Sequence, residues 1–368
     1  MRLRHPDGSI VHLAYCTNVH PAEDLPGIRG QLSGFAARVR GLLSADRLGV
    51  GLWLPHDAAR ALLDDHAELV RLRSLLDDLG LEVVTLNGFP YRGFHQEVVK
   101  YRVYSPDWAC ADRLRYTLDL AEILAALLPD DIDEGTISSL PLAWRTGWTP
   151  GKAAVVAGML DQAALGLRAL AERTGKVVRL ALEPEPGCIV ETTAQAAHHL
   201  RGVDRDFVGV CLDACHLAVG FERARIELDL PIVKLQASCA LEAPAGSQAA
   251  LSAFAEPRFL HQARSASGSV DDLDEALAGG LPADEDWRVH FHMPLHATPP
   301  PPLTTTSPYL RELLGTLFGG RTPATRHVEV ETYTWSVLPG GAPDLAEGIA
   351  AELDWTRREL AALGLKEL

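Results

Sequence analysis

The chain of 368 residues has few cysteines, and none of them forms a CxxC pair. A zinc site built from thiolates needs two such closely spaced pairs, so this class of site is excluded. We interpret the cysteines as reduced, small apolar side chains, which predicts a cytoplasmic location. They lie at Cys16, Cys110, Cys188, Cys211, Cys215 and Cys239.

Long apolar runs and clusters of basic residues are also missing. The N-terminal sequence MRLRHPDGSIVHLAYC lacks an apolar stretch of signal-peptide length, and no later run is predicted to span a bilayer. The formal net charge is −15, from 49 acidic and 34 basic residues, and no local basic patch offsets it. Such a surface repels phosphate backbones and anionic lipids. We therefore expect a small-molecule partner, with no nucleic-acid binding and no direct membrane insertion.

Nine short apolar runs alternate with amphipathic helical segments along the chain. Short strands separated by longer helices are typical of parallel βαβ units. Two of the helical segments end in a glycine, Gly80 and Gly175, where a helix C-cap is expected. The nine runs are HLAYC (12–16), LGVGLWL (48–54), EVVTL (82–86), TISSL (136–140), VVRLALE (177–183), VGVCLD (208–213), IVKLQ (232–236), RVHFHM (288–293) and HVEVET (327–332).

Eight such units close a (β/α)8 TIM barrel, which leaves one run too many. A barrel of this type takes about 250 residues and can exceed roughly 400 with insertions, so the length permits it. The alternative is an open doubly wound sheet, but a nucleotide-binding sheet of that kind carries GxGxxG after its first strand. The corresponding segment, HLAYCTNVHPAED (12–24), contains no glycine. We therefore predict an α/β fold of the (β/α)8 barrel type.

Polar residues collect at the predicted strand ends in the second half of the chain. In such barrels the catalytic groups lie at the carboxyl ends of the strands and in the loops that follow. Oxygen ligands with one or two imidazoles suit a hard or borderline divalent cation. The alternative to metal binding, for any single residue, is an ordinary polar residue that ends a strand with its side chain in solvent. The residues concerned are Glu183, Asp213, His216, Gln236, His290, His292 and Glu331, while the first half offers His20, His56 and Asn87.

The motifs LEPEPG, LDACH, KLQAS and VEVETYTW resemble the metal-site series of the xylose isomerase-like TIM barrels. That superfamily holds sugar isomerases and epimerases together with relatives of AP endonucleases. The resemblance implies a divalent metal ion (Mn²⁺, Mg²⁺, Co²⁺ or Zn²⁺) and places His216 at the substrate or at a second metal. It also implies that Glu183 and Glu331 are the acid/base groups. The implied metal ligands are Glu183, Asp213, Gln236 and Glu331.

Nearly the whole chain also resembles the EboE-type metabolite traffic proteins. The motifs that carry this second resemblance are HLAYCTNVHPAE near the start, FLHQ (259–262), WRVHFHMPL and VEVETYTWSVLP. It leaves open a non-catalytic, accessory role in which the protein binds a metabolite for export or hand-off.

The spacing of the motifs departs from the family pattern in one place. Glu183 and Asp213 are 30 residues apart and Asp213 and Gln236 are 23 apart, but 95 residues separate Gln236 from Glu331. Either Gln236 ends strand seven and RVHFHM belongs to an insertion at about 240–325, or RVHFHM is strand seven and His292 replaces Gln236 as a ligand. We prefer the first interpretation, with a single domain over 1–368, because it preserves the Glu-Asp-Gln spacing.

These residues predict a divalent-metal-dependent isomerase or epimerase of a small sugar-like or hydroxycarbonyl metabolite, which reacts through an enediolate. A metal-dependent hydrolase related to AP endonucleases is disfavoured by the acidic net charge and by too few histidines for a three-zinc cluster. The predicted substrate-binding residues are His216, His292, Glu185 and Trp335.

Residues two apart on a strand point to the same face, so His290 shares a face with His292. Of the histidine pair, we expect His292 to reach the substrate or the metal and His290 to lie one layer deeper. Glu185 and Glu329 share faces with the two catalytic glutamates, and for each the second interpretation is a deeper polar position.

Overall fold

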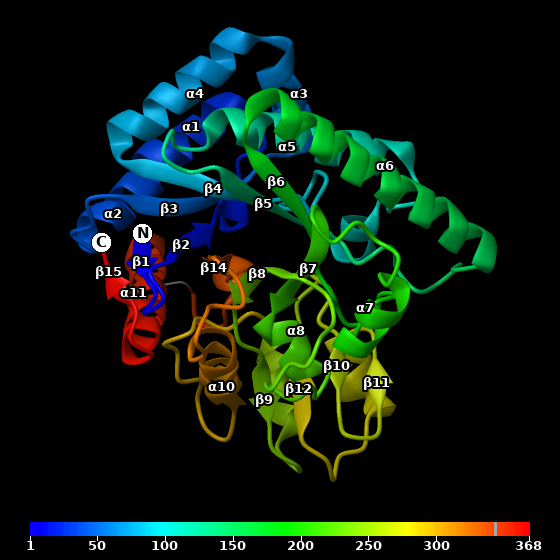
Figure 1. Cartoon of the computed structure of the whole chain (residues 1–368). Helices are drawn as coiled ribbons and strands as arrows, with labels where there is room; N and C mark the ends of the chain where they lie inside the picture. Colours follow the sequence, from blue (N-terminus) through cyan, green and yellow to red (C-terminus); the bar gives the residue numbers. More distant parts are fainter. Residues whose placement is uncertain (342–343) are drawn as a thin grey trace.

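The computed structural model describes residues 1–341 and 344–368, and eight parallel strands form its central sheet. Strand β14 pairs with β8 on one side and with β2 on the other, which closes the sheet into a barrel (Figure 1). The predicted (β/α)8 fold is confirmed. The barrel strands are β2 (Ile10–Cys16), β3 (Leu48–Trp53), β4 (Leu81–Asn87), β5 (Glu134–Ser139), β6 (Val177–Leu182), β7 (Val208–Asp213), β8 (Ile232–Ala237) and β14 (His327–Val330).

Helices cover the outside of the barrel between successive strands (Figure 1). The two glycines predicted as C-caps follow α4 and α6 and adopt left-handed backbone angles, with φ of +64° at Gly80 and +70° at Gly175. The helical segments are η1 (Thr17–Val19), α1 (Leu25–Gln31), η2 (Leu32–Ala36), α2 (Ala37–Leu42), α3 (His56–Asp64), α4 (His66–Leu79), η3 (Lys100–Tyr104), α5 (Ala111–Leu127), α6 (Pro150–Thr174), α7 (Thr193–His199), α8 (Ala214–Val219), η6 (Tyr333–Val337) and α11 (Leu345–Ala362).

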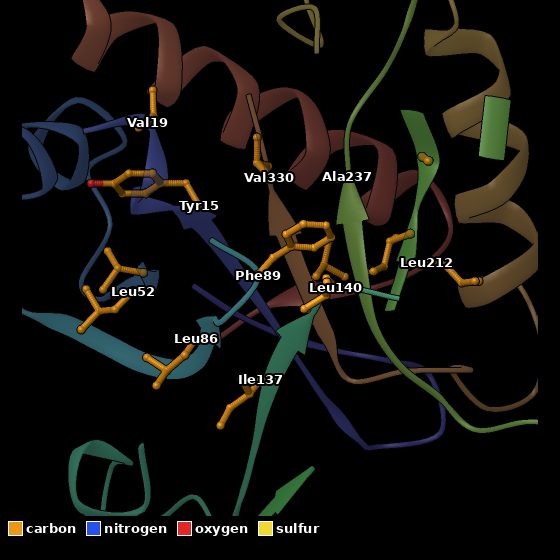
Figure 2. Packing of buried hydrophobic residues seen from close by; sticks show 14 of the residues in the cluster. Tyr15, Val19, Leu52, Leu86, Phe89, Ile137, Leu140, Leu212, Ala237 and Val330 are labelled. Carbon is orange, nitrogen blue, oxygen red and sulfur yellow. The ribbon is translucent and has the colours of Figure 1, made fainter. Parts of the chain in front are cut away.

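Apolar residues alternate along the barrel strands and belong to the main hydrophobic core. Figure 2 shows several of them, including Leu52, Leu86, Ile137, Leu212 and Val330. Since alternate residues point to opposite faces of a strand, their neighbours in sequence point into the barrel. The apolar residues thus fill the layer between the sheet and its helices.

The inward positions are small or polar instead. A Cβ atom on Gly51 would lie 1.4 Å from Glu329 Oε1, so glycine leaves the space that this carboxylate occupies. Thr136 Oγ1 donates a hydrogen bond to Thr85 Oγ1 at 2.8 Å. Lys234 Nζ lies 2.7 Å from Glu329 Oε2, and both side chains are fully buried. The barrel interior therefore holds an ion pair that has no access to water.

Helix α6 is long and apolar enough to cross a bilayer by length and composition, although the sequence was not expected to contain such a run. In the structure it packs against α5 and β6. Its buried residues recur at helical spacing, at Val156, Leu160, Ala163, Ala164, Leu167 and Leu170. This spacing is typical of a helix that packs one face against a barrel.

The chain between β8 and β14 forms a second, antiparallel sheet with the strand order β11-β10-β12-β9-β13. The run RVHFHM overlaps β12, which pairs with β9 and β10 rather than with a barrel strand. RVHFHM is therefore not strand seven, and Gln236 lies on β8, next to β14. This part contains β9 (Leu241–Ala243), η4 (Gln248–Phe254), β10 (Ala263–Arg264), β11 (Ser269–Val270), α9 (Leu273–Glu275), η5 (Ala276–Gly280), β12 (Trp287–Val289), β13 (Thr304–Thr305) and α10 (Ser307–Phe318).

The two ends of the chain lie side by side next to the barrel (Figure 1). Strand β1 (Arg2–Arg4) pairs antiparallel with both β2 and β15 (Lys366–Glu367). This edge is at the opposite end of β2 from the polar strand ends described below.

The buried ion pair predicts a large loss of stability for Lys234→Met. The substitution leaves the Glu329 carboxylate buried without its cation, which typically costs about 3–5 kcal/mol. Urea unfolding followed by circular dichroism measures this loss. The control is Lys152→Met, which removes a partly exposed pair with Asp107 and is expected to cost less than about 1 kcal/mol. Equal losses in the two variants would contradict the prediction.

Candidate metal centre

Three carboxylates meet at the carboxyl end of the barrel. Glu183 directly follows β6, Asp213 ends β7, and Glu331 directly follows β14. Each residue is at most 5% exposed, and one oxygen from each lies within 4.8 Å of the others. They converge because the strands are parallel and the sheet is closed, so that all strand ends of one kind form a single rim.

Several polar atoms of this group have no hydrogen-bond partner among the described residues. They are Glu183 Oε2, Asp213 Oδ2 and both amide atoms of Gln236, all of them buried. Gln236 lies beside Asp213 in the register of β7 and β8. Buried polar atoms without partners are costly, and oxygen donors in this number suit a hard divalent cation. The donor set thus fits the divalent metal ion that the sequence predicts.

The carboxylates also destabilise one another without a cation. Burial raises the pKa of Glu183 well above its ordinary value, and the charges of Glu331 and Asp213 raise it further. Burial likewise raises the pKa of Glu331, and Asp213 and Glu329 add to this effect. In the metal-free protein, protons therefore compete with a cation for these oxygens.

Two asparagines hold Glu331 in place. Asn18 Nδ2 and Asn87 Nδ2 donate hydrogen bonds to Glu331 Oε1 at 2.7 and 2.8 Å. Asn87 ends β4, as the sequence predicts, whereas Asn18 lies two residues past β2 and is not among the predicted site residues. Its position just beyond a barrel strand is the signal that could have identified it.

Three imidazoles form a second group beside the carboxylates. His216 Nε2 lies 3.0 Å from His290 Nε2, which lies 3.2 Å from His292 Nε2. His216 is on α8, directly after β7, whereas His290 and His292 follow β12 of the second sheet. The prediction that His290 lies one layer deeper is wrong: β12 ends at Val289, the chain turns, and both rings reach the cavity.

Each imidazole donates through Nδ1, which fixes its tautomer. The acceptors are Pro184 O for His216, Gln262 Oε1 for His290 and Glu331 O for His292, at 2.9, 2.6 and 2.7 Å. Burial lowers the pKa of all three rings, that of His216 to about 4, so the rings are neutral at pH 7. Three Nε2 lone pairs therefore face one another, an arrangement that a shared cation stabilises.

The orientation of the Gln262 amide supports the assignment of the His290 proton to Nδ1. Gln262 Nε2 donates to Pro186 O and to Tyr104 Oη, both at 2.9 Å, so its oxygen must face His290. Tyr104 Oη in turn donates to Glu185 Oε1 at 2.7 Å. Burial raises the pKa of Glu185 to about 8. This chain of hydrogen bonds links the second sheet to the end of β6.

The other predicted side chains divide between the cavity and its surroundings. Glu185 lies at the cavity, while Glu329 lies deeper and pairs with Lys234. Trp335 does not reach the cavity described by these residues: its Nε1 donates to Glu352 Oε2, and its ring lies against Gly348 of α11. Strand β14 ends at Val330 and the η6 turn redirects the chain, so the period-two pattern does not extend to Trp335.

A cavity opens above these groups at the carboxyl end of the barrel. Tyr333 lines it, and the Tyr333 Oη atom lies 3.3 Å from His290 Nε2. The ionisable residues at its inner end are Glu183, Glu185, Glu331, His216, His290 and His292. The cavity thus gives a small molecule direct access to both the carboxylates and the imidazoles.

The family model of the xylose isomerase-like TIM barrels matches residues 46–246, more than half of the chain. The chain belongs to the xylose isomerase-like TIM barrel family. No curated protein matches it. Among solved structures, a xylose isomerase-like TIM barrel protein from Mycobacterium smegmatis, determined in complex with magnesium, is 13% identical with a TM-score of 0.53. The alignment covers 96% of this chain and 97% of that protein.

Two further solved structures share the fold of this xylose isomerase-like protein. One, from Anabaena variabilis ATCC 29413, is provisionally described as a sugar phosphate isomerase/epimerase and is 15% identical, with a TM-score of 0.52 over 96% of this chain and 100% of that one. The other is AsbF from Bacillus anthracis, involved in petrobactin synthesis, which is 14% identical with a TM-score of 0.50 over 94% and 98%. At these identities the likeness is one of fold.

Adding Mn²⁺ to the metal-free protein is expected to raise its melting temperature by several degrees. A ligand at about 100 times its Kd stabilises the native state by about 2.7 kcal/mol. The Asp213→Asn variant should lose most of this shift, since it replaces a carboxylate donor by an amide. Asp206→Asn, at an exposed position, is the control and should keep it. Differential scanning fluorimetry checks both, and an unchanged shift in Asp213→Asn would contradict the assignment of this ligand.

The raised pKa of Glu185 predicts that the metal-free protein loses stability as the pH rises. The folded pKa of about 8 exceeds the ordinary value of 4.5, so the folded state holds a proton that the unfolded state releases. The contribution is complete below pH 4.5 and is lost as the pH rises through about 8, at up to about 1.4 kcal/mol per pH unit. Urea unfolding between pH 6 and 8 should show a smaller decline for Glu185→Gln than for the unchanged protein. Parallel declines would contradict this prediction.

Proposed function

We propose that the protein is a divalent-metal-dependent isomerase or epimerase of a small hydroxycarbonyl metabolite. One observation carries the proposal: carboxylates from three barrel strands converge beside an open cavity, with buried oxygen atoms that lack hydrogen-bond partners among the residues that the structure describes. Such a donor set combines metal binding with groups that can accept a proton, which are the two requirements of an enediolate mechanism.

Glu183, Asp213, Gln236 and Glu331 would hold the metal. A divalent cation bound there would polarise a carbonyl oxygen and a neighbouring hydroxyl oxygen of the substrate, which would acidify the C–H bond of the hydroxyl-bearing carbon. The surrounding residues keep the donors in position: Ser238 Oγ and the His216 backbone N–H donate to Asp213 Oδ1, at 2.8 and 2.9 Å.

The proton transfers would belong to Glu183 and Glu331. One carboxylate accepts the proton of the C–H bond, whose electron pair moves into the enediolate, and a carboxylic acid then returns a proton to carbon. Carboxylates commonly act as general bases in proteins, and both groups line the cavity in which a substrate would bind. The Asn18 and Asn87 amides keep Glu331 oriented throughout.

Substrate orientation would fall to His216, His292 and Glu185. All three line the cavity, and neutral imidazoles with free Nε2 lone pairs accept hydrogen bonds from substrate hydroxyls. The chain would form one domain in which the segment at about 240–325 is inserted between the last two barrel strands. That segment brings His290 and His292 to the rim.

The comparisons support this function at the level of the family. The family is that of the xylose isomerase-like barrels, the Mycobacterium smegmatis relative was determined with magnesium, and the Anabaena variabilis relative is described as an isomerase/epimerase. Mg²⁺, Mn²⁺, Co²⁺ and Zn²⁺ are all accepted by carboxylate and amide oxygens, so the donor set leaves the identity of the cation open.

The three imidazoles favour a second candidate function, metal-dependent hydrolysis. Asp213, His216 and His292 form one group that could hold a metal ion, and Glu185, His216 and His290 form another. Both groups are richer in nitrogen than the carboxylate group beside them, which suits Zn²⁺. Two neighbouring cations can activate water for hydrolysis of a phosphate ester. Hydrolysis of bis(p-nitrophenyl) phosphate that depends on Zn²⁺ and is lost in His290→Gln would favour this candidate.

Proton exchange tests the isomerase proposal directly. The Mn²⁺-loaded protein is incubated in D₂O with hydroxypyruvate and a panel of ketoses, and ¹H NMR follows the loss of the C–H signal. We expect exchange with at least one compound and a decrease of about 10²–10⁴-fold in Glu183→Gln and in Glu331→Gln, the usual contribution of an acid/base group.

Glu191→Gln serves as the matched control, because this glutamate pairs with Arg264 outside the cavity. It should exchange at the rate of the unchanged protein. Exchange that survives in Glu331→Gln would remove this residue from the mechanism. Tight binding of metal and ligand with no exchange for any compound would reject catalysis and favour the accessory, metabolite-binding role of the EboE-type proteins.

A further inference from the structure

The outer part of the cavity is apolar, in contrast to its inner end. The side chains there come from the loop after β4 and from the segment before β10, beyond the strand ends that carry the carboxylates. They are Phe89, Phe94, Val99, Val103, Phe259 and Leu260. Trp53, Phe94, Val99, Phe259 and Tyr333 form a hydrophobic cluster separate from the main core.

We call the outer apolar side chains, together with Tyr333, the wall of the cavity. Three aromatic rings of this wall contact one another in pairs. The ring centroids of Phe94 and Phe259 are 5.2 Å apart, those of Phe94 and Tyr333 are 5.3 Å apart, and those of Phe259 and Tyr333 are 4.9 Å apart. The backbone N–H groups of Val99 and Lys100 both donate to Arg258 O, which joins the two segments. The wall is therefore formed before any ligand binds.

The wall offers little to a charged or hydroxylated ligand. Lys100 is the one lysine or arginine among the described lining residues, and its ammonium group already pairs with Asp272. The Tyr104 hydroxyl donates to Glu185, and the backbone N–H groups of Val99 and Lys100 are already paired. A phosphate group placed here would lack a counter-ion, and each hydroxyl would lose its bonds to water without replacement.

We propose that the ligand of this cavity has a compact polar head, a hydroxyl group next to a carbonyl or carboxyl group, and an uncharged apolar tail that is branched or aromatic. The proposal rests on the proposed function, which places the head at the carboxylates and imidazoles. The tail lies against Phe94, Val103 and Phe259, where it removes apolar surface from water. A polyhydroxylated or phosphorylated tail is rejected by the same wall.

Binding of matched 2-hydroxy acids tests this proposal. The full-length protein loaded with Mn²⁺ is titrated by calorimetry with glycolate, 2-hydroxyisocaproate, 3-phenyllactate, erythronate and 3-phosphoglycerate, which share one head and differ in the tail. We expect at least one of the two apolar-tailed acids to bind ten times more tightly than glycolate, and erythronate and 3-phosphoglycerate to bind no more tightly than glycolate. Tighter binding of either polar-tailed acid, equal binding of all five, or no binding of any would overturn the proposal.

Two variants assign the preference to the wall. Val103→Thr keeps the shape of the side chain and adds a hydroxyl, and Phe259→Leu removes one ring of the aromatic group. Each should reduce the preference for the apolar-tailed acid over glycolate at least threefold. Val70→Thr, a half-exposed position on α4, is the control for the same chemical change. If Phe259→Leu does not fold, Val103→Thr decides, and an unchanged preference in it overturns the role of the wall.

These measurements separate the ligand class from the reaction. Calorimetry needs no turnover, so an apolar-tail preference without proton exchange contradicts the proposed reaction and leaves the ligand class standing. Exchange with a ketose that carries a polar tail, combined with equal binding of all five acids, contradicts the ligand class and leaves the reaction standing.

Discussion

The pairing of β14 with β2 joins the last barrel strand to the first, and the polar groups at the rim depend on it. Glu331 follows β14 and Asn18 follows β2, and the hydrogen bond between them joins residues that are 313 positions apart in the chain. Without closure the strand ends would form an open edge, and Glu331 would have neither Asn18 nor Asn87 beside it. The closed sheet therefore determines the donor set as well as the fold.

Charge is the second constraint on this barrel. Glu183, Asp213, Glu331 and Glu329 bring four carboxyl groups into the closed interior, and Lys234 supplies the buried positive charge beside them. Burial acts to lower the pKa of Lys234, but the Glu329 carboxylate raises it above its ordinary value, so the lysine stays charged. The excess of negative charge at the rim is relieved by protons in the metal-free protein and by a cation otherwise.

The sequence allowed the barrel and most of the rim to be predicted, because parallel strands place their carboxyl ends together whatever the loops do. Glu183, Asp213, Gln236 and Glu331 could be located by counting along strands. The positions of His290, Trp335 and Tyr333 could not. His290 follows a strand of the second sheet rather than a barrel strand, and Tyr333 and Trp335 lie in η6, beyond the end of β14, where the alternation of side chains no longer applies. Tyr104 and Gln262 contact the site through tertiary packing, which leaves no local pattern in the sequence.

The second sheet also affects how the barrel can close. Strands β8 and β14 are neighbours in space but are separated by a long stretch of chain, and closing a long flexible loop costs conformational entropy. Strand β13 pairs with β9, which places Thr304 beside Glu242. Once this pairing has formed, the connection that must be ordered between β8 and β14 is reduced to the short link before β9 and the segment with α10. The sheet that carries His290 and His292 thus shortens the path by which the barrel reaches its closed topology.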